Sequence, residues 1–254
     1  MVGFSGKVPY ELRRPGGDID TKRMFNVPGV LLVIAALNIL VFFALVFLPF
    51  RTADTLVKIA AVTPKWFLMG PEAHGGWLNM LYPLISHMFI HAGLLHLGLN
   101  MLWLLAFGAP VARRMKAGGA IQSFSAFARA GLFTSFYLLC GIAGALTFIA
   151  LHADEIIPMV GASGAVSGLL GGLVRFAFNK TTLFGPEYAA LSPLTAQSVV
   201  VWSAFIILMN IGFGVFGGAL AGGASIAWEA HVGGYLFGLL AYPAFERMAR
   251  SMGA

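Results

Sequence analysis

Long apolar runs that carry almost no charge dominate this sequence and leave few folds open to it. Residues 28–50 and 196–216 contain no Asp, Glu, Lys or Arg, and each run reaches the roughly 20 residues that a membrane-spanning helix needs. Charged residues make up 10% of the 254-residue chain, whereas a soluble domain carries about 25%. Backbone polar groups must pair internally in hydrocarbon, so such runs form helices. The sequence therefore predicts an all-α, multi-pass membrane protein.

Six runs of this kind divide the chain. We expect transmembrane helices near residues 28–50, 93–112, 127–151, 161–178, 196–216 and 229–247. Together they predict one membrane domain over residues 28–247, between an N-terminal tail at 1–27 and a C-terminal tail at 248–254.

Two connections between the spans are unusual. Residues 51–92 are broken by prolines and glycines yet rich in Trp, Phe, Tyr and Leu. This composition predicts short helices that lie in the membrane interface, where aromatic rings settle. Residues 212–228 are rich in glycine. They are expected to form a loop, either a plain flexible connection or a mobile cap that admits substrate and water.

The basic residues predict how the helices are oriented. The net charge is +6 and the pI is near 9.7, but the basic residues lie at the ends of apolar runs, so nucleic-acid binding is not expected. Of the 16 Lys and Arg residues, only Arg51, Lys58 and Lys65 fall on one side of the predicted membrane. By the positive-inside rule, both termini are expected in the cytoplasm. The absence of a long soluble domain favours a bacterial inner membrane.

Small residues predict which helices pack most closely. Gly164 and Gly168 recur at a spacing of four on the fourth span, and Gly234 and Gly238 do so on the sixth. Such faces let two helix backbones approach each other in lipid. We therefore expect these two spans to pack together near their outer ends.

A serine and a histidine lie at matching depths on these two helices. Ser163 begins the fourth span, and His231 lies near the start of the sixth. Polar and ionisable residues within membrane spans are candidates for function, and histidine is the usual base that activates a serine nucleophile. His96 and Asn100, four residues apart on the second span, and the backbone N–H of Ser163 are plausible donors to an oxyanion.

These motifs together resemble those of the rhomboid family of intramembrane serine proteases. The matching patterns are His96-x-x-x-Asn100, Gly161-Ala162-Ser163-Gly164 and His231-x-x-Gly234-x-x-x-Gly238. The resemblance covers about residues 28–247 and implies a six-helix bundle of rhomboid type. It also implies that Ser163 is the nucleophile and His231 the general base, in a dyad without a third acid. Asn100, His96 and the N–H of Ser163 would stabilise the oxyanion.

The resemblance further implies what the protein acts on. Substrates would be single-span membrane proteins, cleaved within the lipid bilayer near their outer ends, with no cofactor and no metal. The sequence departs from the family at two places. Ser167 stands where many members carry an aromatic residue that stacks on the catalytic histidine, and Tyr82-Pro83 stands in place of Trp-Arg.

Three other functions would leave different features in the sequence. A catalytically weak or inactive relative would bind and escort membrane proteins, and it should lack the serine or the histidine. A transporter would predict an internal repeat or acidic residues in the middle of the spans, and neither is evident. A metal site built on His87, His91 and His96 has no carboxylate or cysteine nearby to complete it. His87 and His91 are expected to face an aqueous entrance or to cap the second span. Glu229, two residues before His231, is expected to face away from it.

Overall fold

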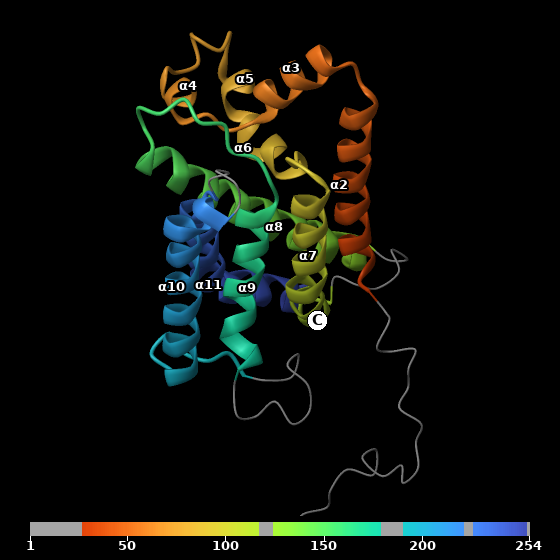
Figure 1. Cartoon of the computed structure of the whole chain (residues 1–254). Helices are drawn as coiled ribbons and strands as arrows, with labels where there is room; N and C mark the ends of the chain where they lie inside the picture. Colours follow the sequence, from red (N-terminus) through yellow and green to blue (C-terminus); the bar gives the residue numbers. More distant parts are fainter. Residues whose placement is uncertain (1–26, 117–123, 179–189, 221–225, 253–254) are drawn as a thin grey trace, which may run out of the picture.

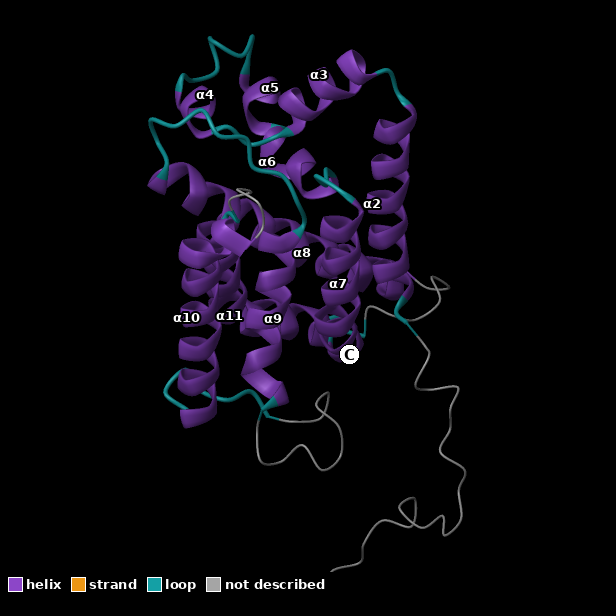
Figure 2. Ribbon diagram, in the orientation of Figure 1, coloured by secondary structure: helices purple, strands orange, loops and turns teal. Residues whose placement is uncertain are grey.

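Helices make up nearly all of the regular secondary structure in the described residues. A computed structural model of the chain describes residues 27–116, 124–178, 190–220 and 226–252 (Figures 1 and 2). The long helices are α2 (Gly29–Phe47), α7 (Leu94–Arg114), α8 (Phe124–Leu151), α9 (Ser163–Ala177), α10 (Gln197–Leu220) and α11 (Trp228–Ser251). Within the described parts, strand pairing is limited to an isolated antiparallel bridge between Val62 and Met159.

The predicted helices are present, and four of them meet the requirements of a membrane span. Each of the six predicted ranges holds one long helix. By length and composition, Gly29–Phe47, Leu94–Arg114, Ser125–Leu151 and Gln197–Val215 are long and apolar enough to cross a membrane. Helix α9 has only 15 residues. Helix α11 carries buried Glu229 and Glu246, which lower its apolar character.

The expected loop at 212–228 is partly wrong. Helix α10 continues to Leu220, so the first glycines of that segment are helical, while Gly222 and Gly223 lie outside the described residues. Glycine costs a helix only about 1 kcal/mol relative to alanine. Gly214 also has a packing role, because a Cβ on it would come within 1.9 Å of the Trp228 ring. The N-terminal tail at 1–26 likewise lies outside the described residues.

The first connection folds into short helices rather than a span. They are α3 (Phe50–Ala60), α4 (Pro64–Leu68), α5 (Trp77–Leu81), α6 (Pro83–Ser86) and the 3₁₀ helix η2 (His87–Phe89). Pro64 and Pro83 each sit in the first turn of a helix, where the missing N–H of proline costs nothing. In Figure 1 these helices gather at the end of the bundle where α9 and α11 begin, opposite the C-terminus.

Helix α9 is the centre of the bundle. Eleven of its 15 residues are buried, and it contacts α7, α8, α10 and α11. Its contact with α11 is the closest, since a Cβ on Gly234 would lie 2.0 Å from the carbonyl oxygen of Gly164, and one on Gly238 would lie 1.9 Å from that of Gly168. The predicted packing of the two glycine faces is therefore confirmed. It holds two helices at a separation that any larger side chain would forbid.

A buried ion pair joins the bundle at its opposite end. Arg114 Nη2 of α7 lies 2.9 Å from Glu246 Oε1 of α11, and both side chains are 2% exposed. The Arg114 guanidinium also lies 4.5 Å from the centre of the Phe176 ring on α9. Removing one partner of such a pair leaves an uncompensated buried charge. The contact thus joins three helices on the side away from Ser163.

Candidate active site

The turn before α9 presents Ser163 at the first position of the helix. Gly161 has φ +122°, a conformation that glycine adopts without strain and that other residues rarely adopt. A Cβ at this position would also come within 2.8 Å of the His96 ring. Glycine therefore serves two purposes here: it allows the turn, and it lets the His96 imidazole approach the serine.

Two contacts with the first connection hold this turn in place. The N–H of Gly161 donates to the carbonyl oxygen of His87 at 2.8 Å, and Met159 and Val62 exchange backbone hydrogen bonds at 2.8 and 3.1 Å. Val62 and Met159 are also buried in one small apolar cluster. The short helices of the first connection therefore support the segment that leads into Ser163.

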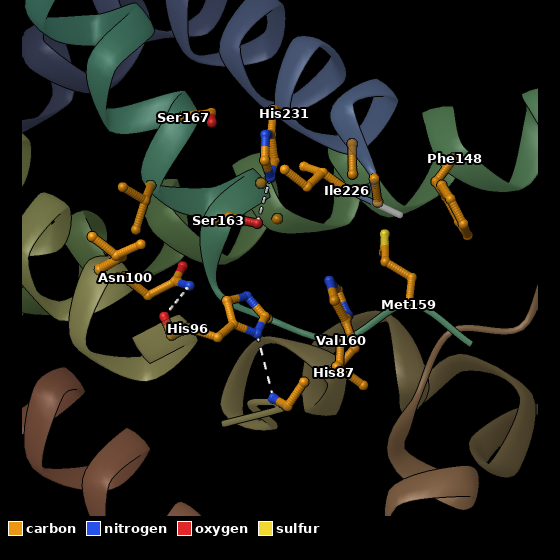
Figure 3. A pocket seen from close by; sticks show the side chains of 18 of the residues that line it. His87, His96, Asn100, Phe148, Met159, Val160, Ser163, Ser167, Ile226 and His231 are labelled. Atoms are coloured by element: carbon orange, nitrogen blue, oxygen red, sulfur yellow. Dashed lines mark hydrogen bonds between the residues drawn. The ribbon is translucent and has the colours of Figure 1, made fainter. Parts of the chain in front are cut away.

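The hydroxyl of Ser163 and the imidazole of His231 are hydrogen-bonded. His231 Nε2 lies 2.7 Å from Ser163 Oγ, although the two residues are 68 positions apart in the chain. Figure 3 shows the two side chains pointing toward each other from α9 and α11. The predicted proximity of these two groups is thus present. It follows from the glycine contacts that bring the starts of the two helices together.

Asn210 of α10 contacts the other nitrogen of the histidine, and the sequence reasoning missed it. Asn210 Oδ1 lies 2.9 Å from His231 Nδ1, and Asn210 Nδ2 donates to the Ile206 carbonyl at 2.9 Å. A carbonyl can only accept, so the amide nitrogen must face Ile206 and the amide oxygen must face His231. The available signal was an asparagine in the middle of an apolar run, which marks a candidate functional residue.

This contact determines the tautomer of His231. An amide oxygen can only accept, so Nδ1 carries the hydrogen that is shared with Asn210. In the neutral ring Nε2 is then unprotonated and accepts the hydroxyl hydrogen of Ser163. This is the state that a general base needs before it activates a serine.

His96 and Asn100 of α7 lie beside Ser163. The N–H of Ala92 donates to His96 Nδ1 at 3.3 Å, so in the neutral ring the hydrogen is on Nε2, the atom that faces Gly161. Asn100 Nδ2 donates one hydrogen to the His96 carbonyl at 2.9 Å and retains a second. Both side chains line the same cavity as Ser163 (Figure 3). Each therefore has an N–H available near the hydroxyl.

The two histidines of the first connection are buried, and His87 lines the same cavity as Ser163 (Figure 3). His87 is 2% exposed and His91 is 6% exposed. Burial lowers the pKa of His87 to about 4, and burial together with the neighbouring His96 lowers the pKa of His91 to about 4. His87 uses its ring to bond the Pro83 carbonyl at 2.8 Å. His87 therefore lines the cavity as a neutral ring, and His91 packs as a neutral ring against His96, with 5.1 Å between the ring centres.

Glu229 and Ser167 lie near the dyad without joining it. Glu229 Oε1 lies 3.1 Å from His152 Nε2, just beyond the end of α8. The predicted orientation of Glu229 away from His231 is confirmed. Ser167 lies one turn after Ser163 on α9 and lines the same cavity. Asn210, from a different helix, contacts the ring that an aromatic residue at position 167 would stack against.

A cavity of about 850 Å³ surrounds Ser163. Its polar lining includes His96, Asn100, Asn210 and His231. Its apolar lining includes a row of residues one turn apart on α7, namely Leu95, Leu99, Trp103 and Phe107. A mostly apolar cavity with a few convergent polar groups is typical of a ligand site. This one is large enough to hold several residues of an extended peptide.

The fold and the site define a helical membrane protein with an oriented serine–histidine pair in an apolar cavity. The chain belongs to the rhomboid family: the family model described as "Rhomboid domain" matches residues 78–247. That match contains His96, Asn100, Ser163, Asn210 and His231.

Individual relatives agree with this assignment. The chain is 30% identical over 207 residues to "Rhomboid protease GluP" of Bacillus subtilis, which covers 81% of this chain and 32% of that protein. It is 30% identical over 186 residues to "RHOMBOID-like protein 4" of Arabidopsis thaliana, covering 73% and 37%. It is 25% identical over 178 residues to "Rhomboid protease GlpG" of Serratia proteamaculans, covering 70% and 52%. The chain thus spans about a third to a half of these relatives.

Proposed function

We propose that this protein is an intramembrane serine endopeptidase that cleaves transmembrane segments. The observation that carries the proposal is the 2.7 Å contact between Ser163 Oγ and His231 Nε2. Membership of a family that includes proteins named rhomboid proteases supports it. A protein that only binds and escorts membrane proteins has no need of a serine hydroxyl aligned with an unprotonated imidazole nitrogen.

The proposed reaction has two halves. In the first, Ser163 Oγ attacks the scissile carbonyl carbon while its proton passes to His231 Nε2. The resulting oxyanion accepts hydrogen bonds from the backbone N–H of Ser163, from His96 Nε2–H and from the second hydrogen of Asn100 Nδ2. His231 then gives the proton to the leaving amine, the C–N bond breaks, and an ester on Ser163 remains.

In the second half, water replaces the amine. His231 removes a proton from the water as it attacks the ester carbonyl, and the same groups stabilise the second oxyanion. Collapse of this intermediate breaks the ester bond, and the proton on His231 returns to Ser163 Oγ. The carboxyl fragment then leaves. The proton balance closes without any cofactor or metal ion.

We place the protein in the membrane by its charge distribution. All six long helices, α9 and α11 included, would form the bundle that crosses the bilayer, with α3–α6 in the interface. The three basic residues of the first connection, Arg51, Lys58 and Lys65, would face outward, and both termini would lie in the cytoplasm. Ser163 would then lie toward the outer side. Relatives occur in a bacterium and in a plant, so the comparisons do not select a bacterial inner membrane.

The proposed substrates are single-span membrane proteins. A peptide bond inside a helix is shielded by its own hydrogen bonds, so the segment to be cut must first unwind. Helix-breaking residues near the cut would lower that cost. The apolar row on α7 provides a surface on which the unwound segment could lie beside Ser163.

A cleavage assay tests the proposal. Purified protein in proteoliposomes is incubated with a fluorescently labelled single-span substrate, beside Ser163→Ala and His231→Ala. We expect cleavage by the wild type and loss of about 10⁴-fold or more in either variant, since members of a serine–histidine unit act together. A fluorophosphonate probe should label Ser163 and should fail with both variants. Cleavage by Ser163→Ala at the wild-type rate would refute the proposal. Binding of the substrate without cleavage or labelling would favour the escort function.

A further inference from the structure

The active site draws one residue from a helix that is weakly attached to the rest of the chain. In the described part of α10, only Val199 and Ile206 are buried apolar residues, while its other large apolar side chains are mostly exposed. Figure 1 shows α10 at the edge of the bundle beside α11. A helix with few buried contacts belongs to the least stable part of a structure. Asn210, which contacts the histidine, is part of this helix.

Two side-chain hydrogen bonds join α10 to α11. Ser203 Oγ lies 2.7 Å from Tyr235 Oη, and Asn210 Oδ1 lies 2.9 Å from His231 Nδ1. Ser203 and Asn210 are seven residues apart and lie on one face of α10, while His231 and Tyr235 are four apart and lie on one face of α11. The two bonds therefore form one row between the helices. Only the second bond reaches the catalytic pair.

The bond from Asn210 has a chemical consequence that packing alone would not have. It fixes the hydrogen on Nδ1 of His231, leaves Nε2 free to accept from Ser163, and resists rotation of the ring. As His231 takes the serine proton, Nδ1–H becomes a stronger donor, so the bond to the amide oxygen strengthens as charge develops. A group whose contact strengthens along the reaction raises kcat rather than substrate affinity.

We infer that Asn210 is a positioning residue for His231, so that the site is a Ser163–His231–Asn210 arrangement and not a dyad. The inference rests on the proposed peptidase function. It also makes the seating of α10 against α11 a condition for catalysis. If α10 moves away, His231 loses the acceptor that orients it, even though Ser163 and His231 remain on α9 and α11.

Three variants test this inference. Asn210→Leu removes the acceptor at similar volume. Asn210→Asp keeps an acceptor oxygen at the same position. Ser203→Ala is the matched control, because it removes the neighbouring bond between the same two helices without touching His231. For each, kcat and KM are measured in proteoliposomes with the labelled substrate, the rate of fluorophosphonate labelling is measured without substrate, and thermal stability is recorded.

The expected result is a split between the variants. Asn210→Leu should lose roughly 10- to 100-fold in kcat with little change in KM, which is part of the 10²–10⁴ that a positioned general base supplies. Its labelling rate should fall in parallel. Asn210→Asp should retain most of the activity, and Ser203→Ala should remain near the wild type.

Three results would overturn the inference. The first is wild-type kcat in a folded Asn210→Leu variant. The second is a loss in Ser203→Ala that matches the loss in Asn210→Leu, which would show that α10 docking alone matters. The third is an Asn210→Asp variant as inactive as Asn210→Leu. These outcomes are distinct from failure of the proposed function, which would appear as cleavage by Ser163→Ala.

Discussion

Adding one methyl group between α9 and α11 should separate the catalytic pair. Gly234 lies one turn beyond His231 on α11 and faces the backbone of α9. A Cβ on Gly234 would lie 2.0 Å from the Gly164 carbonyl oxygen and 3.1 Å from that of Cys140. Both neighbours are backbone atoms, which cannot rotate away as a side chain can. In the Gly234→Ala variant, the helices themselves must move.

The size of the movement follows from ordinary contact distances. Carbon and oxygen atoms in close contact are about 3.3–3.6 Å apart, so α9 and α11 must separate by more than about 1 Å at this level. Ser163 adjoins Gly164, so the same movement takes the 2.7 Å bond between Ser163 and His231 beyond the usual hydrogen-bond limit of about 3.2 Å. A misplacement of about 1 Å can cost about 100-fold in rate, and overpacking costs about 1–3 kcal/mol of stability.

The assay measures kcat in proteoliposomes and thermal stability in detergent for Gly234→Ala and two companions. Gly238→Ala meets an equally close backbone contact, 1.9 Å from the Gly168 carbonyl oxygen, but one turn further from His231. It should lose similar stability and less of its kcat. Gly131→Ala on α8, where an added Cβ meets nothing within 4 Å, should leave both values close to the wild type or slightly improve stability.

One result would refute this reasoning. A Gly234→Ala variant with wild-type kcat and unchanged stability would mean that α9 and α11 do not approach as closely as described. The proximity of Ser163 and His231 would then need another cause.

Two further predictions concern the surroundings of the site. Gly161→Ala should lose activity more than stability, because the new Cβ would meet the His96 ring at 2.8 Å in a strained turn with φ +122°. The measurement is kcat and thermal stability of the variant beside the wild type, and a fully active variant would contradict the prediction. Partial burial lowers the pKa of His152, but hydrogen bonds and charge from Glu155 and Glu229 outweigh it, so the pKa is raised. The stabilisation by His152 should be complete below its unfolded pKa of about 6.5 and lost as pH rises through the raised folded pKa. The stability difference between wild type and His152→Gln should therefore be larger at about pH 6 than at about pH 9, and a difference independent of pH would exclude this role.

The elements of this site that could be predicted share one property: each belongs to a pattern along the chain. The glycines of α9 and α11 recur every fourth residue, so their facing contact could be expected before any coordinates, and with it the approach of Ser163 to His231. His96 and Asn100 are one turn apart on a single helix, so their common direction was also implied. The apolar runs predicted the long helices because backbone N–H and C=O groups in hydrocarbon must hydrogen-bond to each other, and a helix satisfies them within one segment.

Asn210 shows where such reasoning stops. It is a lone polar residue in an apolar run, and nothing in its local sequence indicates which helix it faces. The burial of His87 and His91 could not be predicted for a related reason, because it depends on how the helices around the first connection pack against it. The glycines of α10 seemed to belong to a loop, although one of them accommodates the Trp228 ring inside a helix.

The resemblance of its motifs indicated the rhomboid family. Composition and spacing alone determined that this chain is a helical membrane protein and where most of its long helices run. These properties depend on composition and on spacing within one helix, which the solvent and the backbone decide locally. Tertiary structure decided which ring nitrogen of His231 carries the hydrogen and that Asn210 accepts it. It also decided how the first connection supports the turn before Ser163. Those properties depend on contacts between residues far apart in the chain, and only the packing of whole helices against each other brings such residues together.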